Sequence, residues 1–479
     1  MKSDTASLSK FSPSYWREWY TRPCGGREVL RVALPIVISC GTIAIMNMTD
    51  RMFLSWYDPT AMNASFQSGC LIWALLTFPQ QLASFVNTFV AQYFGAGQKE
   101  RIGSNIWQGI FLGVVFGLLF VAATPLVGPF FRALGTPRDV SLLEQKYWFY
   151  FCLGAVPAIA HEPLASFFTG QRKMKVVMTL GIATVLMNVI LDPILIFGIG
   201  GYCRLGLAGA AIASAASLWF KFFAYYWLVR RADKSGEFGF RKQCRFDWLE
   251  MKRLLRFGSM SGVQSMMENA FLTVFVLLVG WFGVKESAAT AIAFNLNSLM
   301  LVPIYGLGVA TATLVGNQVG AQRLDLASRA AYTSATLACA FAGVFVVVFL
   351  TMPNFFLDIY MAKNPEKFAE IRSIAFNLLR IVAVYLFANT VNSIFTASLR
   401  GAGDTRFIML ATFCVSAPIL AIMFGGVIWF QQGFYWCWSL QVSYIFINAT
   451  VFAIRFAGGE WKQKSLVKQP AKRLKGEFA

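Results

Sequence analysis

The chain has 479 residues, of which 57% are hydrophobic and only 14% are charged, and its formal net charge is +19. A soluble domain carries about 25% charged residues, and a soluble protein of this composition would expose large apolar patches. The composition therefore excludes a set of soluble domains and predicts an integral membrane protein that crosses the bilayer many times.

Stretches that lack charge and are long enough to cross the hydrocarbon core follow one another along the chain. The first half contains six of them, some interrupted by a single ionisable residue: residues 32–49, 59–98, 102–131, 147–171, 176–200 and 206–229. A basic segment, 230–256, then precedes a second series: 257–284, 287–322, 330–350, 373–397 and 407–454. The last stretch is long enough for two spans with a turn at 431–433. Twelve spans are therefore the most economical count.

The distribution of lysine and arginine predicts the orientation. With the N-terminus placed inside, 31 of these residues fall in cytoplasmic segments and nine in outer loops. By the positive-inside rule, both termini and the linker 231–250 are expected in the cytoplasm. The basic residues are scattered through short loops, so we expect a lipid bilayer and no nucleic acid as partner. The nine cysteines show no metal spacing and predict no disulfide framework.

The two halves repeat each other at an offset near 225 residues. Pro79 and Pro303 fall at corresponding places, as do the pairs Gly95-Ala96 and Gly320-Ala321. Each repeat holds six spans, so both halves enter the membrane from the same side, an arrangement suited to alternating access at their interface. The expected division is a cytoplasmic segment 1–26, an N-lobe 27–230, a linker 231–250, a C-lobe 251–457 and a basic cytoplasmic tail 458–479.

Ionisable residues inside the spans are the first functional candidates, because their burial in a membrane is costly. Four acids qualify: Asp50, Glu162, Asp192 and Glu268. A carboxyl group in a low-dielectric cavity can take up and release a proton near neutral pH, and with hydroxyl and amide oxygens it can bind Na⁺. Asn188 lies four residues before Asp192, so the two share one helix face.

Several ordered motifs carry a family resemblance. They include Asn47-Met-Thr-Asp50, Val90-Ala-Gln92-Tyr-Phe-Gly95-Ala96, Asn188-Val-Ile-Leu-Asp192-Pro193, Val315-Gly-Asn317-Gln-Val-Gly320-Ala321 and Leu399-Arg400-Gly401-Ala-Gly403-Asp404. At these positions the sequence resembles the multidrug and toxic compound extrusion (MATE) family of cation-coupled antiporters, over roughly residues 27–455. The resemblance implies an all-α fold of twelve transmembrane helices in two six-helix lobes that form a V.

The resemblance also implies roles for individual residues in the N-lobe. Asp50, Asn188, Asp192 and Ser214 match the cation-coupling site, where Na⁺ can bind at Asp50 and Asp192. Pro35 matches the proline at which the first helix is proposed to bend when this site is protonated.

In the C-lobe, Glu268 matches the acid of the seventh span and is grouped with Asn295 and Asn389 as a cation or substrate site. Asn389 stands where the family often has an aspartate, which weakens the case for a complete second cation site. Glu162 falls near the repeat equivalent of Asn389, so Glu162 and His161 are secondary candidates.

Structural alternatives remain open for each of these residues. Asp50 could form an interfacial ion pair with Arg51, and Asp192 could be a structural hydrogen-bond acceptor. Glu268 could be held by Asn269 or Asn295. Three further alternatives are that Glu162 pairs with Arg172 near the cytoplasmic mouth, that His161 is structural, and that Lys221 and Arg380 extend towards the interface or pair with acids.

The expected function is a secondary antiporter of the inner membrane. It would export amphipathic, often cationic, organic compounds in exchange for H⁺ or Na⁺, as a monomer and without a cofactor. The sequence contains no nucleotide-binding loop, and with one histidine it offers little for an intramembrane enzyme. The main alternative is a lipid-linked oligosaccharide flippase, which would call for about fourteen spans and a cationic cavity; a channel is a further alternative.

Overall fold

The computed structural model describes residues 13–133, 138–199, 204–361 and 365–467, and within these residues every regular element is helical. The helices of the first half are α1 (Pro13–Thr21), α2 (Gly26–Tyr57), α3 (Pro59–Ser84), α4 (Val86–Gly95), α5 (Glu100–Ala122), α6 (Thr124–Ala133), α7 (Arg138–Cys152), α8 (Ala155–Gly170), α9 (Met174–Phe197) and α10 (Leu207–Ala232). Those of the second half are α11 (Trp248–Gly280), α12 (Val284–Gly320), α13 (Leu324–Thr351), α14 (Pro353–Met361), α15 (Pro365–Ala402), α16 (Thr405–Ile428), α17 (Phe434–Gly458) and the short 3₁₀ helix η1 (Glu460–Gln463).

These helices confirm the predicted fold class. The described residues contain eleven helical segments long and apolar enough to cross a membrane, and a twelfth when α7 and α8, bent by 40° at their junction, are taken as one span. Three predicted spans are each broken into two helices. Prolines explain two of the breaks, because Pro125 and Pro157 lie in the first turns of α6 and α8, where a missing backbone N–H is tolerated.

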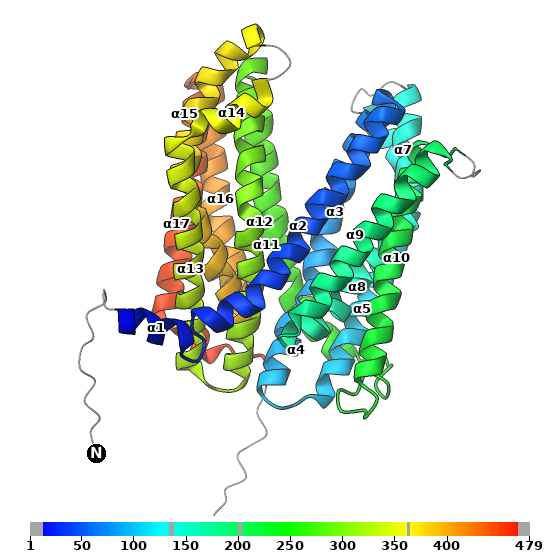
Figure 1. Cartoon of the computed structure of the whole chain (residues 1–479), viewed down its shortest axis with the longest axis vertical. Helices are drawn as coiled ribbons and strands as arrows, with labels where there is room; N and C mark the ends of the chain where they lie inside the picture. The colour runs from blue at the N-terminus through cyan, green and yellow to red at the C-terminus, as the bar shows by residue number, and fades with distance from the viewer. Residues whose placement is uncertain (1–12, 134–137, 200–203, 362–364, 468–479) are drawn as a thin grey trace, which may run out of the picture.

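Figure 1 shows two groups of helices that lie close together at one end and diverge towards the other. Helices α2–α10 form the N-lobe and α11–α17 form the C-lobe, and α2 leans from one group towards the other. We call the end at which the described chain begins and ends the terminal face, and the opposite end the far end. The V shape agrees with the expected architecture.

The repeat is visible in the helix boundaries. The pair α3–α4 begins at Pro59 and ends at Gly95, and α12 begins at Val284 and ends at Gly320, an offset of 225 residues at both ends. Near the terminal face the two glycines make equivalent contacts across the lobes. A Cβ atom on Gly95 would collide with the backbone carbonyl of Asn317, and one on Gly320 would collide with that of Gln92. Glycine is therefore needed at both places for the close approach.

The side chains of Gln92 and Asn317 form a second equivalent pair of contacts. The Gln92 amide donates a hydrogen bond of 2.9 Å to the carbonyl of Gly401 in the opposite lobe. The Asn317 amide donates one of 2.9 Å to the carbonyl of Gly170, also in the opposite lobe. Each amide thus satisfies a carbonyl at the last turn of a helix, which has no partner within its own helix. These contacts hold the lobes together at the terminal face.

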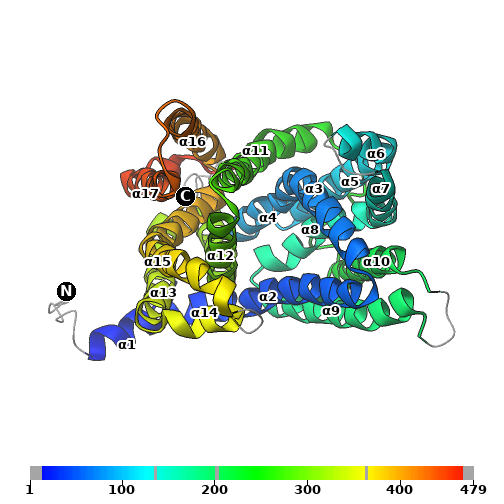
Figure 2. The same cartoon turned by 90° about the horizontal axis from the view of Figure 1, so that it is seen from above.

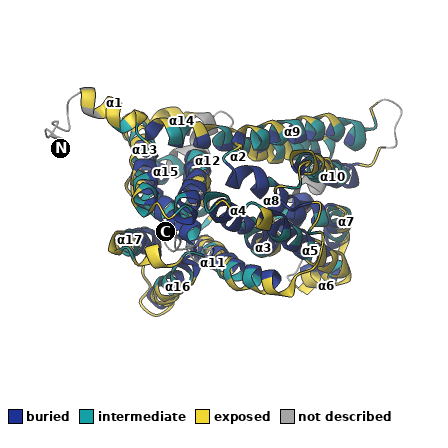
Figure 3. Ribbon diagram, turned by 90° about the horizontal axis from the view of Figure 1, so that it is seen from below, coloured by how far each residue is buried: buried dark blue, intermediate teal, exposed yellow. Residues whose placement is uncertain are grey.

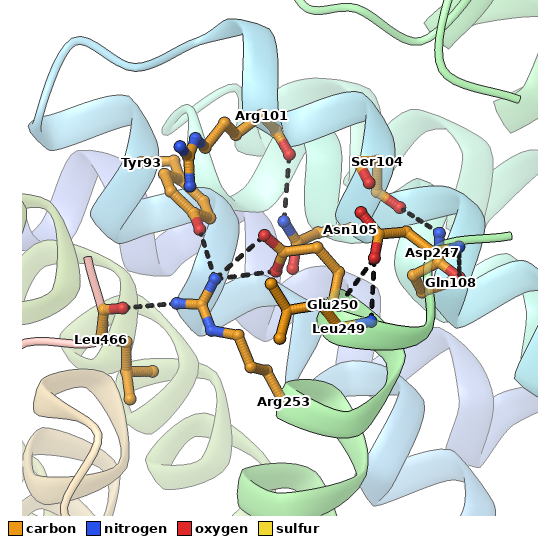
Figure 4. Close-up of polar contacts among 10 residues, drawn as sticks. All are labelled: Tyr93, Arg101, Ser104, Asn105, Gln108, Asp247, Leu249, Glu250, Arg253 and Leu466. Atoms are coloured by element: carbon orange, nitrogen blue, oxygen red, sulfur yellow. Dashed lines mark hydrogen bonds and ion pairs between the residues drawn. The ribbon is translucent and has the colours of Figure 1, made fainter. Parts of the chain in front are cut away.

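The C-terminal segment adds a contact that the repeat does not duplicate (Figure 4). Leu466 follows the C-lobe, yet its side chain is buried among apolar residues of the N-lobe. Its backbone N–H donates to Gln92 Oε1 at 2.8 Å, and its carbonyl accepts from Arg253 at 2.6 Å. Arg253 also donates to Tyr93 Oη at 2.9 Å and pairs with Glu250 at 2.8 Å. The segment therefore straps the C-lobe to the N-lobe.

The apolar core has three main parts. One cluster fills the N-lobe around Phe85 and Phe167, and a second fills the C-lobe around Phe275 and Trp438. The third joins the lobes, because it contains Val32 and other residues of α2 together with residues of α12 and α15. In Figure 3 the buried residues gather on the inner helices and the exposed ones on the outer surface. Many exposed side chains there are large and apolar, as expected of a surface that faces lipid.

Candidate functional site

Four polar side chains from three helices meet in the N-lobe, and they are those that the sequence predicted. Asp50 comes from α2, Asn188 and Asp192 from α9, and Ser214 from α10. The Ser214 hydroxyl donates to Asp50 Oδ2 at 3.1 Å, and the Asn188 amide donates to Ser214 Oγ at 3.4 Å. Asn188 and Asp192 have no exposed surface. We call these four residues the N-lobe acidic site.

Several oxygen atoms of this site are buried without a hydrogen-bond donor among the described residues. They are Asp50 Oδ1, Asn188 Oδ1 and both carboxyl oxygens of Asp192. The Asp50 and Asp192 side chains also interact directly with each other. Buried oxygens without donors are costly unless a proton or a cation satisfies them. Because every candidate ligand is an oxygen, the set suits a proton or a hard cation such as Na⁺.

The site does not resemble a transition-metal centre. The described residues contain no group of three or more His, Cys, Asp and Glu side chains that could hold a metal ion. The two carboxylates, the amide and the hydroxyl supply oxygen ligands and no imidazole or thiolate, so the donor set suits a hard cation.

An apolar cluster lies beside the N-lobe acidic site on the same three helices. Leu54 is four residues after Asp50, Ile196 is four residues after Asp192, and Ala210 is four residues before Ser214. These three residues and Leu207 form one buried cluster. Residues four apart stack one turn along a helix, and the directions of α2, α9 and α10 place this cluster on the far-end side of the site. It separates the acids from that end of the protein.

Pro35 lies in the half of α2 nearest the terminal face. Helix α2 is continuous from Gly26 to Tyr57, and Pro35 is inside it. Its neighbours Val32 and Ile36 belong to the apolar cluster that joins the lobes. Proline removes one backbone hydrogen bond from the helix, so α2 is weakened at the place where the lobes meet. Bending at Pro35 remains a prediction.

The acid of the C-lobe has a different environment. Glu268 Oε1 accepts a hydrogen bond of 2.8 Å from Gln264, which lies one turn earlier on α11. Gln264 Oε1 accepts one of 2.8 Å from Arg400 at the end of α15. Arg400 also reaches Gln81 Oε1 on α3 of the N-lobe at 3.4 Å. The positive charge of Arg400 thus offsets the negative charge of Glu268 through the Gln264 amide. The same arginine bridges the two lobes.

The other C-lobe candidates do not bind Glu268 in the described structure. Asn295 is exposed on α12, Asn389 is half-buried on α15, and the hydrogen bonds of Glu268 involve neither them nor Asn269. Two tyrosines lie near the acid. Tyr305 and Tyr444 are close enough to interact with its charge, and Tyr444 stacks on Phe271 with ring centroids 3.9 Å apart. Tyr444 is buried and Tyr305 is exposed, so an acid near the Tyr305 ring suits an organic cation.

The secondary candidates form a further polar cluster in the N-lobe, on α8 and α10. Lys221 Nζ lies 2.9 Å from His161 Nε2, and Glu162 Oε1 lies 3.4 Å from the same nitrogen. His161 Nδ1 lies 2.9 Å from the carbonyl oxygen of Pro157. The alternative pairing of Glu162 with Arg172 is wrong, because Arg172 forms its ion pair with Glu28 of α2.

Two functional candidates, Arg400 and Glu144, were not singled out by the sequence. Arg400 lies in a recognised motif, but nothing in the sequence indicates that it reaches Gln264. Arg380, which the sequence did single out, lies over the ring of Phe376 at 4.5 Å. Glu144 on α7 is fully buried and its carboxyl oxygens have no donor among the described residues. It escaped attention because the predicted span begins at residue 147, three positions later.

Comparison with known proteins gives one family match. The model of the family described as MatE matches residues 35–194 and 261–426, which includes most of both lobes. The first segment contains Asp50, Asn188 and Asp192, and the second contains Glu268 and Asn389.

Individual relatives agree over most of the chain. A probable multidrug resistance protein NorM of Thermotoga maritima is 23% identical over 444 residues, 92% of this chain and 94% of the relative. A multidrug resistance protein MdtK of Yersinia pestis is 27% identical over 390 residues, 81% of this chain and 84% of the relative. Among solved structures, a MOP superfamily transporter from Pyrococcus furiosus has a TM-score of 0.82 at 18% identity, covering 94% of this chain and 98% of that one.

Proposed function

The chain belongs to the MatE family, and from this premise we propose that it is a secondary antiporter that exports amphipathic, often cationic, organic compounds in exchange for H⁺ or Na⁺. It is a multi-pass transporter of the inner membrane and not an enzyme.

The N-lobe acidic site carries the proposal. Buried carboxyl oxygens without donors need a proton or a cation in at least one state of the protein. A site that binds such an ion on one side of the membrane and releases it on the other can drive transport. The apolar cluster at Leu54 and Ile196 would restrict access from the far end, so opening and closing of the three helices would control the ion.

The residues around Glu268 in the C-lobe support the proposal that the substrates are organic cations. Glu268 offers a negative charge beside the rings of Tyr305 and Tyr444. Two of the relatives are named multidrug resistance proteins, which agrees with an unspecific aromatic site for cations. A flippase for lipid-linked oligosaccharides would call for a basic cavity, whereas the N-lobe site is acidic.

The positive-inside bias supports a cytoplasmic terminal face. In that orientation the lobes meet on the cytoplasmic side, through Gln92 and Asn317, and diverge towards the outside. This arrangement supports the proposal of an alternating-access cycle in which the structure is the outward-facing state, and a single chain is the proposed working unit.

Transport in proteoliposomes tests the proposal. Ethidium movement would be driven in separate experiments by a pH step and by a Na⁺ gradient of equal size. We expect one of them to drive transport in the wild type and neither to do so in Asp192→Asn, which keeps the shape but can neither ionise nor neutralise a cation. Movement that ignores both gradients in the wild type would contradict antiport.

A further inference from the structure

The cluster of His161, Glu162 and Lys221 has no part in the function proposed so far. We infer that these three side chains form a second proton-binding site and a relay for the coupling proton within the N-lobe. The inference rests on the proposed antiport function and commits it to H⁺. Its central observation is that Lys221 Nζ and Glu162 Oε1 both converge on one nitrogen, His161 Nε2, at 2.9 and 3.4 Å.

The contact with Pro157 fixes the state of the imidazole ring. His161 Nδ1 lies 2.9 Å from the Pro157 carbonyl oxygen, which can only accept a hydrogen bond. Nδ1 therefore carries a proton, and in the neutral ring Nε2 offers a lone pair. That lone pair faces the Lys221 ammonium group, which can only donate. A proton shared between these two nitrogens lies on a direct hydrogen-bonded line.

Proton movement inside the cluster leaves its total charge unchanged. When Lys221 gives a proton to Nε2, a neutral amine and an imidazolium replace the ammonium and the neutral ring. The imidazolium then faces the Glu162 carboxylate, which can accept the proton from Nε2 and leave the ring neutral again. Lys221 regains its charge by taking the next proton. Lys221, which donates a proton to the ring, and Glu162, which accepts one from it, are thus both in place before any helix moves.

The cluster lies in the interior of the N-lobe. Helix α8 contacts α3, α4, α5, α7, α9 and α10 and also α12 of the other lobe, and Figure 2 shows it inside the ring of N-lobe helices. The side chain of His161 is 6% exposed, whereas that of Glu162 is 32% exposed. Because other helices contact α8 on several sides, this exposed part of Glu162 lies within the lobe and away from its outer surface. Glu162 is therefore the group from which a proton can leave the cluster.

Other ionisable groups near the cluster are few. Cys40 of α2 interacts with Glu162 and Lys221, and Tyr225 of α10 interacts with Glu162 and lies with its ring over His161 at 6.5 Å. Neither carries a charge that would replace Glu162 as the partner of Lys221. The balance of one ammonium and one carboxylate therefore belongs to the cluster itself.

The position of the cluster suits a relay that serves the N-lobe acidic site. Both sites use α10, and Cys40, which interacts with the cluster, lies on α2 together with Asp50. Lys221 is seven residues after Ser214 on α10, about 10 Å closer to the terminal face at 1.5 Å per residue. Cys40 is ten residues before Asp50 on α2, about 15 Å closer to that face. A proton released at Asp50 and Asp192 would meet the cluster on its way to the cytoplasm.

The variants that test the relay remove proton transfer but leave the charge or the hydrogen-bond acceptor of the cluster in place. Lys221→Arg keeps the positive charge, but a guanidinium does not release its proton in proteins. His161→Gln keeps an acceptor for Lys221 and removes the titrating ring. We expect each to lower ethidium transport driven by a pH step about tenfold or more. Counterflow exchange, which needs substrate binding and no gradient, reports folding and binding in the same liposomes. Lys146→Arg, an exposed lysine of the same lobe, is the matched control.

A spectroscopic measurement follows the ring directly, because His161 is the chain's only histidine. Purified through a tag without histidine, ¹⁵N-histidine-labelled protein gives one pair of imidazole signals. We expect the tautomer protonated at Nδ1 at pH 8 and a change in the Nε2 signal between pH 8 and 5 that Lys221→Arg alters.

Each contrary outcome has a distinct meaning. If a pH step drives transport at the wild-type rate in Lys221→Arg and His161→Gln, the cluster is a structural ion pair and the relay is overturned. Loss of counterflow in both variants, with melting temperatures equal to that of the wild type, would place the cluster in the substrate site, which also overturns the relay. Wild-type transport driven by Na⁺ and indifferent to pH would reject the relay while the proposed antiport stands. Transport indifferent to both gradients would reject the proposed function itself.

Discussion

The two lobes share one architecture but treat their buried acids in opposite ways. In the N-lobe, the oxygens of Asp192 have no donor among the described residues, so the site is incomplete without a proton or a cation. In the C-lobe, Glu268 is already compensated, because Gln264 connects it to Arg400. A cation that binds the C-lobe acid must compete with Arg400, whereas in the N-lobe the charge of Arg51 acts on Asp50 and the Asp192 oxygens have no donor among the described residues. This difference supports the proposal that the N-lobe supplies the ion drive and that the C-lobe binds the substrate.

The largest expected effect tests this division directly. Asp192→Asn should lower gradient-driven ethidium transport at least about a hundredfold, because the titrating group of the drive is lost, whereas counterflow persists. Glu268→Gln should instead weaken ethidium binding about tenfold, roughly 1.4 kcal/mol, because the charge partner of the cation is lost. The opposite pattern, with drive lost only in Glu268→Gln, would reverse the roles of the lobes.

A second effect of similar size concerns the junction of the lobes at the terminal face. Cys24 is buried before α2, and Gln318 of the C-lobe donates to its sulfur at 3.4 Å. Burial, and then the nearby Glu28 carboxylate, raises the pKa of the Cys24 thiol to about 11. A raised thiol pKa leaves little thiolate at pH 7.5, so alkylation should be slow and should accelerate about tenfold per pH unit up to the pKa.

The matched comparison uses two variants, one that retains only Cys24 and one that retains only Cys244, which is exposed in the linker. With a maleimide at pH 7.5, Cys244 should react at least about a hundredfold faster. Equal rates would mean that the terminal face is open in solution. A rise in the Cys24 rate on adding substrate would report separation of the lobes.

A smaller effect concerns the resident arginine. Arg400→Gln removes the positive charge that offsets Glu268, so ethidium should bind about three- to tenfold more tightly, as measured by equilibrium titration. Arg380→Gln, on the same helix but exposed over Phe376, is the control and should change nothing. In a Glu268→Gln background, Arg400→Gln should lose its effect, because the two residues are coupled. Weaker binding in Arg400→Gln alone would make the arginine part of the substrate site.

The sequence predicted the fold and the N-lobe acidic site for identifiable reasons. Hydropathy follows the bilayer thickness, so the spans were found, and the spacing of Asn188 and Asp192 placed both on one face of α9. The resemblance to the MATE family, and not the spacing, grouped these two residues with Asp50 and Ser214. The C-lobe network was not predicted, because Arg400 reaches Gln264 across 136 positions in the sequence. The same limit applies to Lys221 and His161, whose contact depends on how α8 and α10 pack. Contacts between distant helices depend on rotation and register, which hydropathy does not encode.

The smallest expected effect concerns the symmetry of the terminal face. Gly95→Ala and Gly320→Ala each place a Cβ atom against a backbone carbonyl of the other lobe, and overpacking of this kind costs about 1 kcal/mol or more. Each should therefore raise the Cys24 alkylation rate about fivefold. Gly343→Ala on α13 has open space and is the control.

The strap at Leu466 breaks this symmetry. Gly320 faces the carbonyl of Gln92, and the side chain of Gln92 also accepts a hydrogen bond from the Leu466 N–H. Gly95 faces the carbonyl of Asn317, and in the described structure Asn317 has no such contact with the C-terminal segment. A shift of Gln92 should loosen the strap as well as the lobe contact, so Gly320→Ala should have the larger effect. Removing residues 464–479 should abolish the difference between the two alanine variants. If the difference survives that deletion, the strap contributes nothing to holding the lobes together.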